Sequence, residues 1–152
     1  KDRIIPDCVR AMEKGQEITV RNPYSKRPYQ HVLEPVVTYL IIAAEQCRNH
    51  LLAGNYNVGP DDCDCVNTGE LVNLFCEKWG ESARWKNISE ENAPHEANFL
   101  KLDCSKIKKS LAWNPRWHIS DAIEKTVEWS KAYLGGQDIK AVMNKQIEEY
   151  LV

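Results

Sequence analysis

The chain has 152 residues, of which 43% are hydrophobic and 28% charged, and its formal net charge is −2 at pH 7. This length suits one domain with its own core. The balanced charge gives none of the basic excess that is typical of nucleic-acid-binding proteins, so no nucleic-acid partner is expected. The longest apolar run, at about 36–44, is too short to span a bilayer, and no signal peptide precedes "IIPD". We therefore expect no membrane partner and a cytoplasmic location.

The first half of the chain alternates helical and extended patterns. Pro6 suits the first turn of a short helix that Gly15 ends, and the β-branched "EITVR" predicts a strand. Pro35 likewise suits the first turn of a long helix, and Thr68 can cap the next one. The predicted elements are a helix at 4–14, a strand at 17–21, a helix at 34–52, a short buried strand at 55–60 and a helix at 69–79.

The long helix at 34–52 gives the strongest periodic signal. Its apolar residues recur at helical spacing, as expected of a face that packs on something apolar. They are Val36, Val37, Leu40, Ile41, Ala44 and Cys47.

The second half of the chain is also mostly helical. Ser120 is expected to cap a helix that turns Ala122, Ile123, Val127 and either Trp129 or Ala132 inward. The four tryptophans of this half are expected to pack in the core and turns. The predicted elements are strands at 83–89 and 99–103, a polar loop at 90–98, and helices at 105–111, 121–134 and 139–151. The chain is thus predicted to be α/β, mostly helical with several short strands.

Six cysteines are present, at positions 8, 47, 63, 65, 76 and 104. A chain of this length without a secretion signal is expected to keep them reduced. Cys63 and Cys65 form a C-x-C, not the C-x-x-C knuckle of a zinc site, so no metal site is predicted. The acidic stretch from Asp61 to Asp64 is interpreted as a solvated turn.

The motifs of several enzyme classes are missing. The sequence has no G-x-G-x-x-G or G-x-x-G-x-x-G loop, no G-x-S-x-G elbow, and no tyrosine followed four residues later by lysine. No catalytic residue and no cofactor-binding residue is therefore predicted within these 152 residues.

Arg27 stands in a loop, "SKRPYQHVLEP", just before the long apolar helix. Two interpretations are open. The guanidinium can pair with a carboxylate such as Glu34 or Asp103, or it can hold an anion, because its planar fork suits phosphate oxygens.

Several strings, in order, resemble a known family: "DRIIPD", "ITVRNP", "RPYQHVLEP", "YNVGP", "PHEANFLKLDCSKIKKSLAWNP", "AIEKTVEWSKAY" and "QIEEY". They are similar to the C-terminal portion of extended short-chain dehydrogenase/reductases that act on nucleotide sugars, and among these to the CDP-glucose 4,6-dehydratases. The resemblance covers the whole chain but less than half of a complete enzyme. It implies the C-terminal, substrate-binding part of a Rossmann-type fold, 1–152, whose elements at about 29–60 pack on an N-terminal NAD-binding domain that the chain does not include.

The resemblance also implies site residues. Arg27 would contact the diphosphate, while Arg21 would lie along the base and ribose. Arg3, Ile4 and Ile5 would approach the nucleotide, and His95 and Glu96 would close over it. Three of these residues have a structural alternative. Arg3 would belong to a mobile terminus, Arg21 would be a solvated strand end, and His95 would pack within its loop.

The implied function is part of an NAD-dependent lyase that converts CDP-glucose to CDP-4-keto-6-deoxyglucose. NAD would be bound by the other half of the enzyme, the substrate would be a CDP-sugar, and a homo-oligomer is expected. Whether the chain alone is an enzyme is left open. The alternatives are a related epimerase or dehydratase for another nucleotide sugar, and a non-catalytic helical interaction module.

Overall fold

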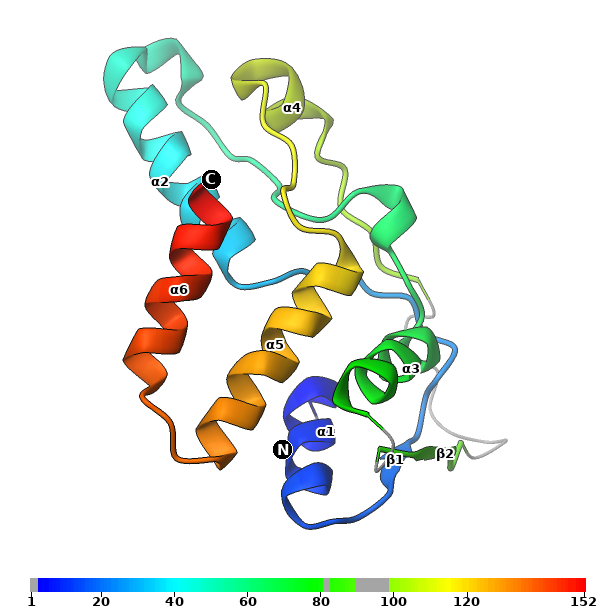
Figure 1. Ribbon diagram of the computed structural model, residues 1–152. Helices are drawn as coiled ribbons and strands as arrows, with labels where there is room; N and C mark the ends of the chain where they lie inside the picture. Colours follow the sequence, from blue (N-terminus) through cyan, green and yellow to red (C-terminus); the bar gives the residue numbers. More distant parts are fainter. Residues whose placement is uncertain (1–2, 81–82, 90–98) are drawn as a thin grey trace.

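The computed structural model describes residues 3–80, 83–89 and 99–152, and helices dominate it (Figure 1). The two strands pair in parallel, with Ile18 opposite Trp85 and Val20 opposite Asn87. None of the helices among the described residues is long and apolar enough to cross a membrane. The elements follow in this order: α1 Ile4–Glu13, β1 Ile18–Val20, α2 Leu33–Arg48, η1 His50–Leu52, η2 Asp62–Asp64, α3 Thr68–Trp79, β2 Trp85–Asn87, α4 Ser105–Leu111, α5 Ile119–Leu134 and α6 Ile139–Leu151.

The main core lies between α1, α3, α5 and β1, the lower part of the molecule in Figure 1. Helical spacing explains α5: its buried residues recur three and four positions apart and form one face toward α3. Phe75 of α3 is fully buried in this core and stacks on Trp79. The buried members are Cys8, Ile18, Val20, Leu71, Val72, Phe75, Ile119, Ile123 and Val127.

A second, smaller core fixes the opposite end of the molecule, where α2 and α4 lie in Figure 1. Ile107 of α4 and Trp113 are buried there beside Cys104. Half-buried side chains from α4 itself and from three other segments pack against them: Leu111 of α4, and Ile42, Tyr56, Val58 and Leu102.

The apolar face predicted for the long helix is largely exposed in the structure. Val36, Leu40 and Ile41 of α2 are 45%, 67% and 38% exposed, and the residues that α2 buries are the polar Glu34 and Thr38. The prediction of a helix is confirmed, but nothing within the described residues covers the face formed by Val36, Leu40 and Ile41.

Other sequence-based boundaries differ locally. The stretches 55–60 and 99–103 are not strands: the first is irregular, and in the second Phe99 forms a single bridge to Lys26. Both short runs are apolar enough to pack but have no neighbouring strand to extend. Asn67 rather than Thr68 caps α3, in a reciprocal pair with Glu70. His118 rather than Ser120 is the N-cap of α5, and Ala132 rather than Trp129 is buried on that helix.

Candidate functional site

The segment that carries Arg27 is fixed against the start of α3. Backbone N–H groups of Thr68 and Gly69 donate to the carbonyls of Ser25 and Pro23, at 3.0 and 2.8 Å. The Thr68 hydroxyl lies 3.1 Å from the Ser25 hydroxyl and 3.0 Å from that of Tyr29. These buried and partly buried polar contacts hold the loop against α3, and such support lets a loop present a charge at a defined place.

Arg27 is half-buried within this fixed loop. Its backbone N–H donates to the Val66 carbonyl at 3.4 Å, and its guanidinium donates to the Lys26 carbonyl at 2.9 Å. The two carboxylates offered as its simplest partners are engaged elsewhere, since Glu34 accepts from the backbone N–H groups of residues 116 and 117, and Asp103 accepts from that of Ser105.

Arg21 follows β1 directly, at a bend, and is exposed. Since β1 and β2 are parallel, the chain leaves both strands at the same edge of the sheet. Beyond that edge Ile88 donates to the Val20 carbonyl at 2.9 Å, and Asn87 donates to the Tyr24 hydroxyl at 3.4 Å.

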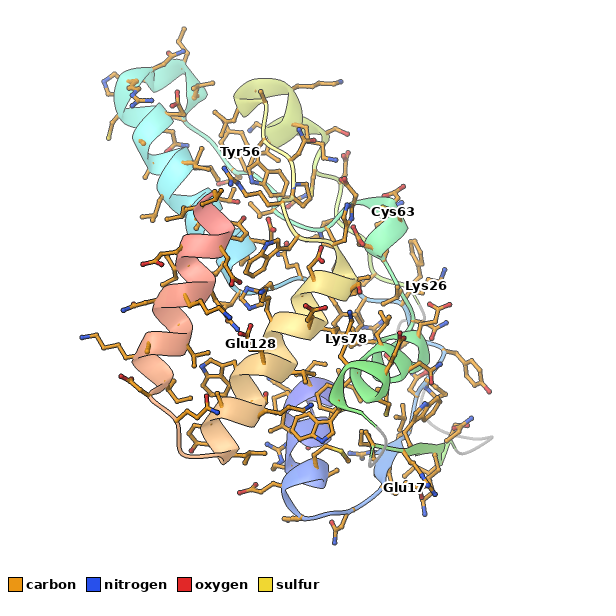
Figure 2. The ribbon with its side chains drawn as sticks, viewed as in Figure 1. Glu17, Lys26, Tyr56, Cys63, Lys78 and Glu128 are labelled. Atoms are coloured by element: carbon orange, nitrogen blue, oxygen red, sulfur yellow. The ribbon has the colours of Figure 1, made fainter. Side chains whose placement is uncertain are left out.

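The predicted residues His95 and Glu96 lie outside the described residues. The chain on either side of 90–98 is described, however, and both flanks adjoin the Arg21–Arg27 stretch. Before the gap lie the contacts of Asn87 and Ile88; after it, Phe99 bridges to Lys26 and Leu100 donates to the Lys26 carbonyl at 3.2 Å. Figure 2 marks Lys26 at this place, beside the start of α3.

The remaining predicted residues start α1. Arg3 is the exposed N-cap residue, whereas Ile4 and Ile5 are half-buried and pack on the main core. Their packing gives the two isoleucines a structural role.

The loop leads into a buried polar cluster of His31, Glu34 and Tyr150, which the sequence did not reveal. Glu34 is 1% exposed, and its carboxylate receives the backbone N–H groups of Arg116 and Trp117 at 3.0 and 2.8 Å. Burial, with a smaller contribution from Lys125, lowers the pKa of His31 to about 4. Burial also raises the pKa of Tyr150 on α6, and the neighbouring Glu34 adds to that rise. The loop is thus anchored at both ends, at α3 and at the turn before α5.

Two further features lie outside the predicted site. A groove of about 440 Å³ runs between 60–62 and 101–105, with Lys108 at its wall, and of the predicted site residues that the structure describes none lines it. In the acidic stretch Asp61 and Asp62 pair with Lys108 and Lys101. Asp64 is not a solvated turn residue, as the sequence suggested, because it is 5% exposed and accepts from the Ile119 N–H at 3.0 Å.

Solved structures share the fold. The chain superimposes on UDP-glucuronic acid 4-epimerase from Bacillus cereus, solved in complex with UDP-glucuronic acid and NAD, with a TM-score of 0.70 and 16% identity, over 87% of this chain and 40% of that one. UDP-N-acetylglucosamine 4-epimerase from Bacillus cereus gives a TM-score of 0.65 at 18% identity, over 86% and 44%. The fold is therefore that of a C-terminal part of the extended short-chain dehydrogenases.

A curated relative is similar in sequence along almost the whole chain. CDP-glucose 4,6-dehydratase of Salmonella typhimurium is 40% identical over 152 residues, which are 99% of this chain and 42% of that enzyme. The resemblance inferred from the motifs is thereby confirmed, although the chain spans less than half the length of these relatives. No family model matches the sequence.

Proposed function

We propose that this chain is the nucleotide-sugar-binding part of an NAD-dependent CDP-glucose 4,6-dehydratase, a lyase that converts CDP-glucose to CDP-4-keto-6-deoxyglucose. The observation that carries the proposal is the hydrogen-bonded Pro23–Glu34 loop, which holds the half-buried residue Arg27. In this proposal Arg27 binds the diphosphate, and Arg21 lies along the nucleoside. Support for the choice of substrate comes from the 40% identity to the Salmonella enzyme.

In this proposal the Pro23–Glu34 loop acts by positioning the nucleotide-sugar substrate. A guanidinium that is held still can form two parallel hydrogen bonds to phosphate oxygens without first losing much side-chain freedom. Holding the diphosphate at one end of the substrate fixes where the sugar lies at the other end, and such orientation is a large part of catalysis. The segment 90–98, which carries His95 and Glu96, would cover the nucleotide from the side of Phe99.

The described residues do not fit NAD. A dinucleotide site needs a glycine-rich turn between a strand and a helix, so that the backbone can approach the pyrophosphate. The strand β1 is followed by Arg21, Asn22 and Pro23 instead, and the sheet has only two strands. NAD would therefore be held by a separate dinucleotide-binding part of the enzyme.

We propose further that the exposed apolar face of α2 packs on that dinucleotide-binding part. The residues from about 29 to 60 include this face, and several large apolar side chains there lie open to solvent. These exposed side chains are Val36, Tyr39, Leu40 and Ile41 of α2 and Leu51 of η1. Contiguous exposed apolar side chains are typical of an interface.

A chimera tests the proposal. The 152 residues replace the matching 42% of the Salmonella enzyme, and calorimetry measures binding of CDP, UDP and dTDP while product formation is followed with the three glucose derivatives. We expect a preference for the cytidine compounds. Arg27→Ala should weaken CDP binding by about 1.5–3 kcal/mol, the value of a charge-assisted hydrogen-bonded pair. Arg48→Ala, at an exposed arginine paired with Glu45, is the matched control and should change little.

The alternatives have distinct outcomes. A chimera that prefers UDP or dTDP indicates a related epimerase or dehydratase for another nucleotide sugar. A folded chimera that binds no nucleotide indicates an interaction module, in which Arg27 is structural.

A further inference from the structure

Three side chains with metal-binding chemistry meet where η2 contacts the start of α5. Cys63, Asp64 and His118 each offer one donor atom, and these atoms all lie within 4.8 Å of one another. Cys63 is visible on the η2 turn in Figure 2. The cluster joins segments 54 residues apart, so sequence spacing gives no sign of it.

Asp64 gives the cluster a rigid member. Its Oδ1 accepts from the Ile119 N–H at 3.0 Å, and the side chain is only 8% exposed. This contact fixes the carboxylate against the first turn of α5 and aims Oδ2 at the two other donors. Oδ2 lies 2.8 Å from His118 Nδ1 and 3.6 Å from Cys63 Sγ.

The other two members can adjust. The His118 side chain is 70% exposed and Cys63 is exposed, so neither is tightly packed. The His118 backbone is nevertheless fixed, because its N–H donates to Asp121 at 3.0 Å. Side-chain rotation alone can therefore move the ring and the sulfur by the fraction of an ångström that a ligand requires.

We propose that Cys63, Asp64 and His118 form a binding site for a divalent cation of the zinc class. Thiolate sulfur, imidazole nitrogen and carboxylate oxygen are the three ligand types that Zn²⁺ takes in proteins, and bonds of about 2.0–2.3 Å place tetrahedral ligands roughly 3.3–3.8 Å apart. The separations of 2.8 and 3.6 Å lie within or near this range, and all three donor atoms are within 4.8 Å of one another. A thiolate also argues against Mg²⁺ and Ca²⁺, which prefer oxygen ligands alone.

Three protein ligands leave a fourth tetrahedral position for water. The site is therefore of the open type, on the surface, and the bound ion crosslinks η2 to α5. Because the connection from 60 to 67 leads directly into the capped start of α3, the ion would steady the segment that contacts the Arg27 loop through Val66.

Binding of Co²⁺ provides the test, because the absorption spectrum of the bound ion shows both its coordination geometry and whether a sulfur ligand is present. We titrate the reduced full chain with Co²⁺ and record the visible bands of a tetrahedral ion and the near-ultraviolet charge-transfer band of a thiolate ligand. We expect both to saturate at an equimolar amount of Co²⁺, to be displaced by Zn²⁺, and to be unaffected by excess Mg²⁺. Zn²⁺ should also raise the Tm, because it binds only the folded chain.

Variants locate the site. Cys63→Ser should abolish the charge-transfer band, and both Cys63→Ser and His118→Asn should weaken Co²⁺ binding more than about tenfold. Asparagine is chosen because it remains a good N-cap for α5. Cys47→Ser, at an exposed cysteine on α2, is the matched control and should keep the wild-type spectrum. The proposal is overturned if no equimolar tetrahedral cobalt spectrum forms, if the charge-transfer band survives in Cys63→Ser, or if it is lost in Cys47→Ser or Cys65→Ser instead.

Discussion

The helices α2 and α5 are both 16 residues long and both carry an apolar repeat, yet they are held in the molecule in opposite ways. α5 buries Ile119, Ile123 and Val127 in the main core, where it packs on α3. α2 buries the polar Glu34 and Thr38 and leaves Val36, Leu40 and Ile41 exposed, while Ile42 on its other side packs on the second core. The apolar face of α5 is covered within this chain, whereas for the exposed face of α2 we propose a covering surface on another part of the enzyme.

The largest expected effect is a difference in stability between variants on the apolar faces of α5 and α2. Ile123→Ala on α5 removes a side chain that is 3% exposed and should lower the free energy of unfolding by about 2–5 kcal/mol. Leu40→Ala on α2, at 67% exposure, should stay within about 0.5 kcal/mol. Urea denaturation of both variants measures this, and equal losses would show that the α2 face is packed after all.

The next effect concerns how α2 is attached. Glu34→Ala leaves the partly buried backbone N–H groups of Arg116 and Trp117 without their acceptor, which should cost about 1–3 kcal/mol of stability. Glu45→Ala, on the same helix but in an exposed ion pair with Arg48, is the control and should cost less than about 1 kcal/mol. A small loss in Glu34→Ala would mean that the polar anchor does not hold α2.

His31, at the entrance to α2, should make this attachment sensitive to pH. The folded chain keeps His31 neutral down to about pH 4, while the unfolded imidazole takes up a proton near its ordinary pKa of 6.5. The unfolded state therefore binds more protons between these values, and stability that is fully present above pH 6.5 is lost as the pH falls toward 4. The loss should be roughly 2–3 kcal/mol.

His31→Asn isolates this contribution, because acidic groups begin to titrate in the same range. Urea denaturation at intervals from pH 7 to 4 should show a flatter stability profile for the variant. Parallel profiles for the variant and the wild type would exclude His31 as the cause.

A charge placed on the exposed face of α2 should have the smallest effect on stability but a clear effect on self-association of the chain. An exposed apolar face favours self-association of the chain when it lacks its partner surface. Leu40→Glu should shift the sedimentation profile toward monomer while changing the free energy of unfolding by about 0.5 kcal/mol or less. A wild-type chain that sediments as a stable monomer at all concentrations would contradict the interface proposed for α2.

The same comparison shows what the sequence could reveal. Helical spacing together with proline, glycine and capping residues located all six α-helices of the described residues, including Ser105–Leu111 to the residue, because these signals are local. The long helix ends at Arg48, earlier than the predicted residue 52, and a short 3-10 turn follows it. These signals could not say which faces are covered, since that depends on surfaces outside the helix. The two false strands, at 55–60 and 99–103, failed for this reason, because a strand needs a partner that its own residues do not specify.

The residues of the candidate site likewise differ in whether the sequence alone could reveal them. Arg27 could be singled out because a charge in a turn before an apolar helix is unusual in the sequence itself. Glu34 could not, because a glutamate in the first turn of a helix ordinarily faces solvent near the positive end of the dipole. Only the fold reveals that the turn at Arg116 and Trp117 closes over it.

The central claim is that the fixed guanidinium of Arg27 binds the diphosphate of a cytidine nucleotide sugar. Its most direct test compares CDP with cytidine by calorimetry, in the chimera with the Salmonella enzyme and in its Arg27→Ala variant. We predict that Arg27→Ala weakens CDP binding by about 1.5–3 kcal/mol and leaves the weaker binding of cytidine unchanged, because only CDP carries the phosphates. Equal affinity of both proteins for CDP would contradict the claim.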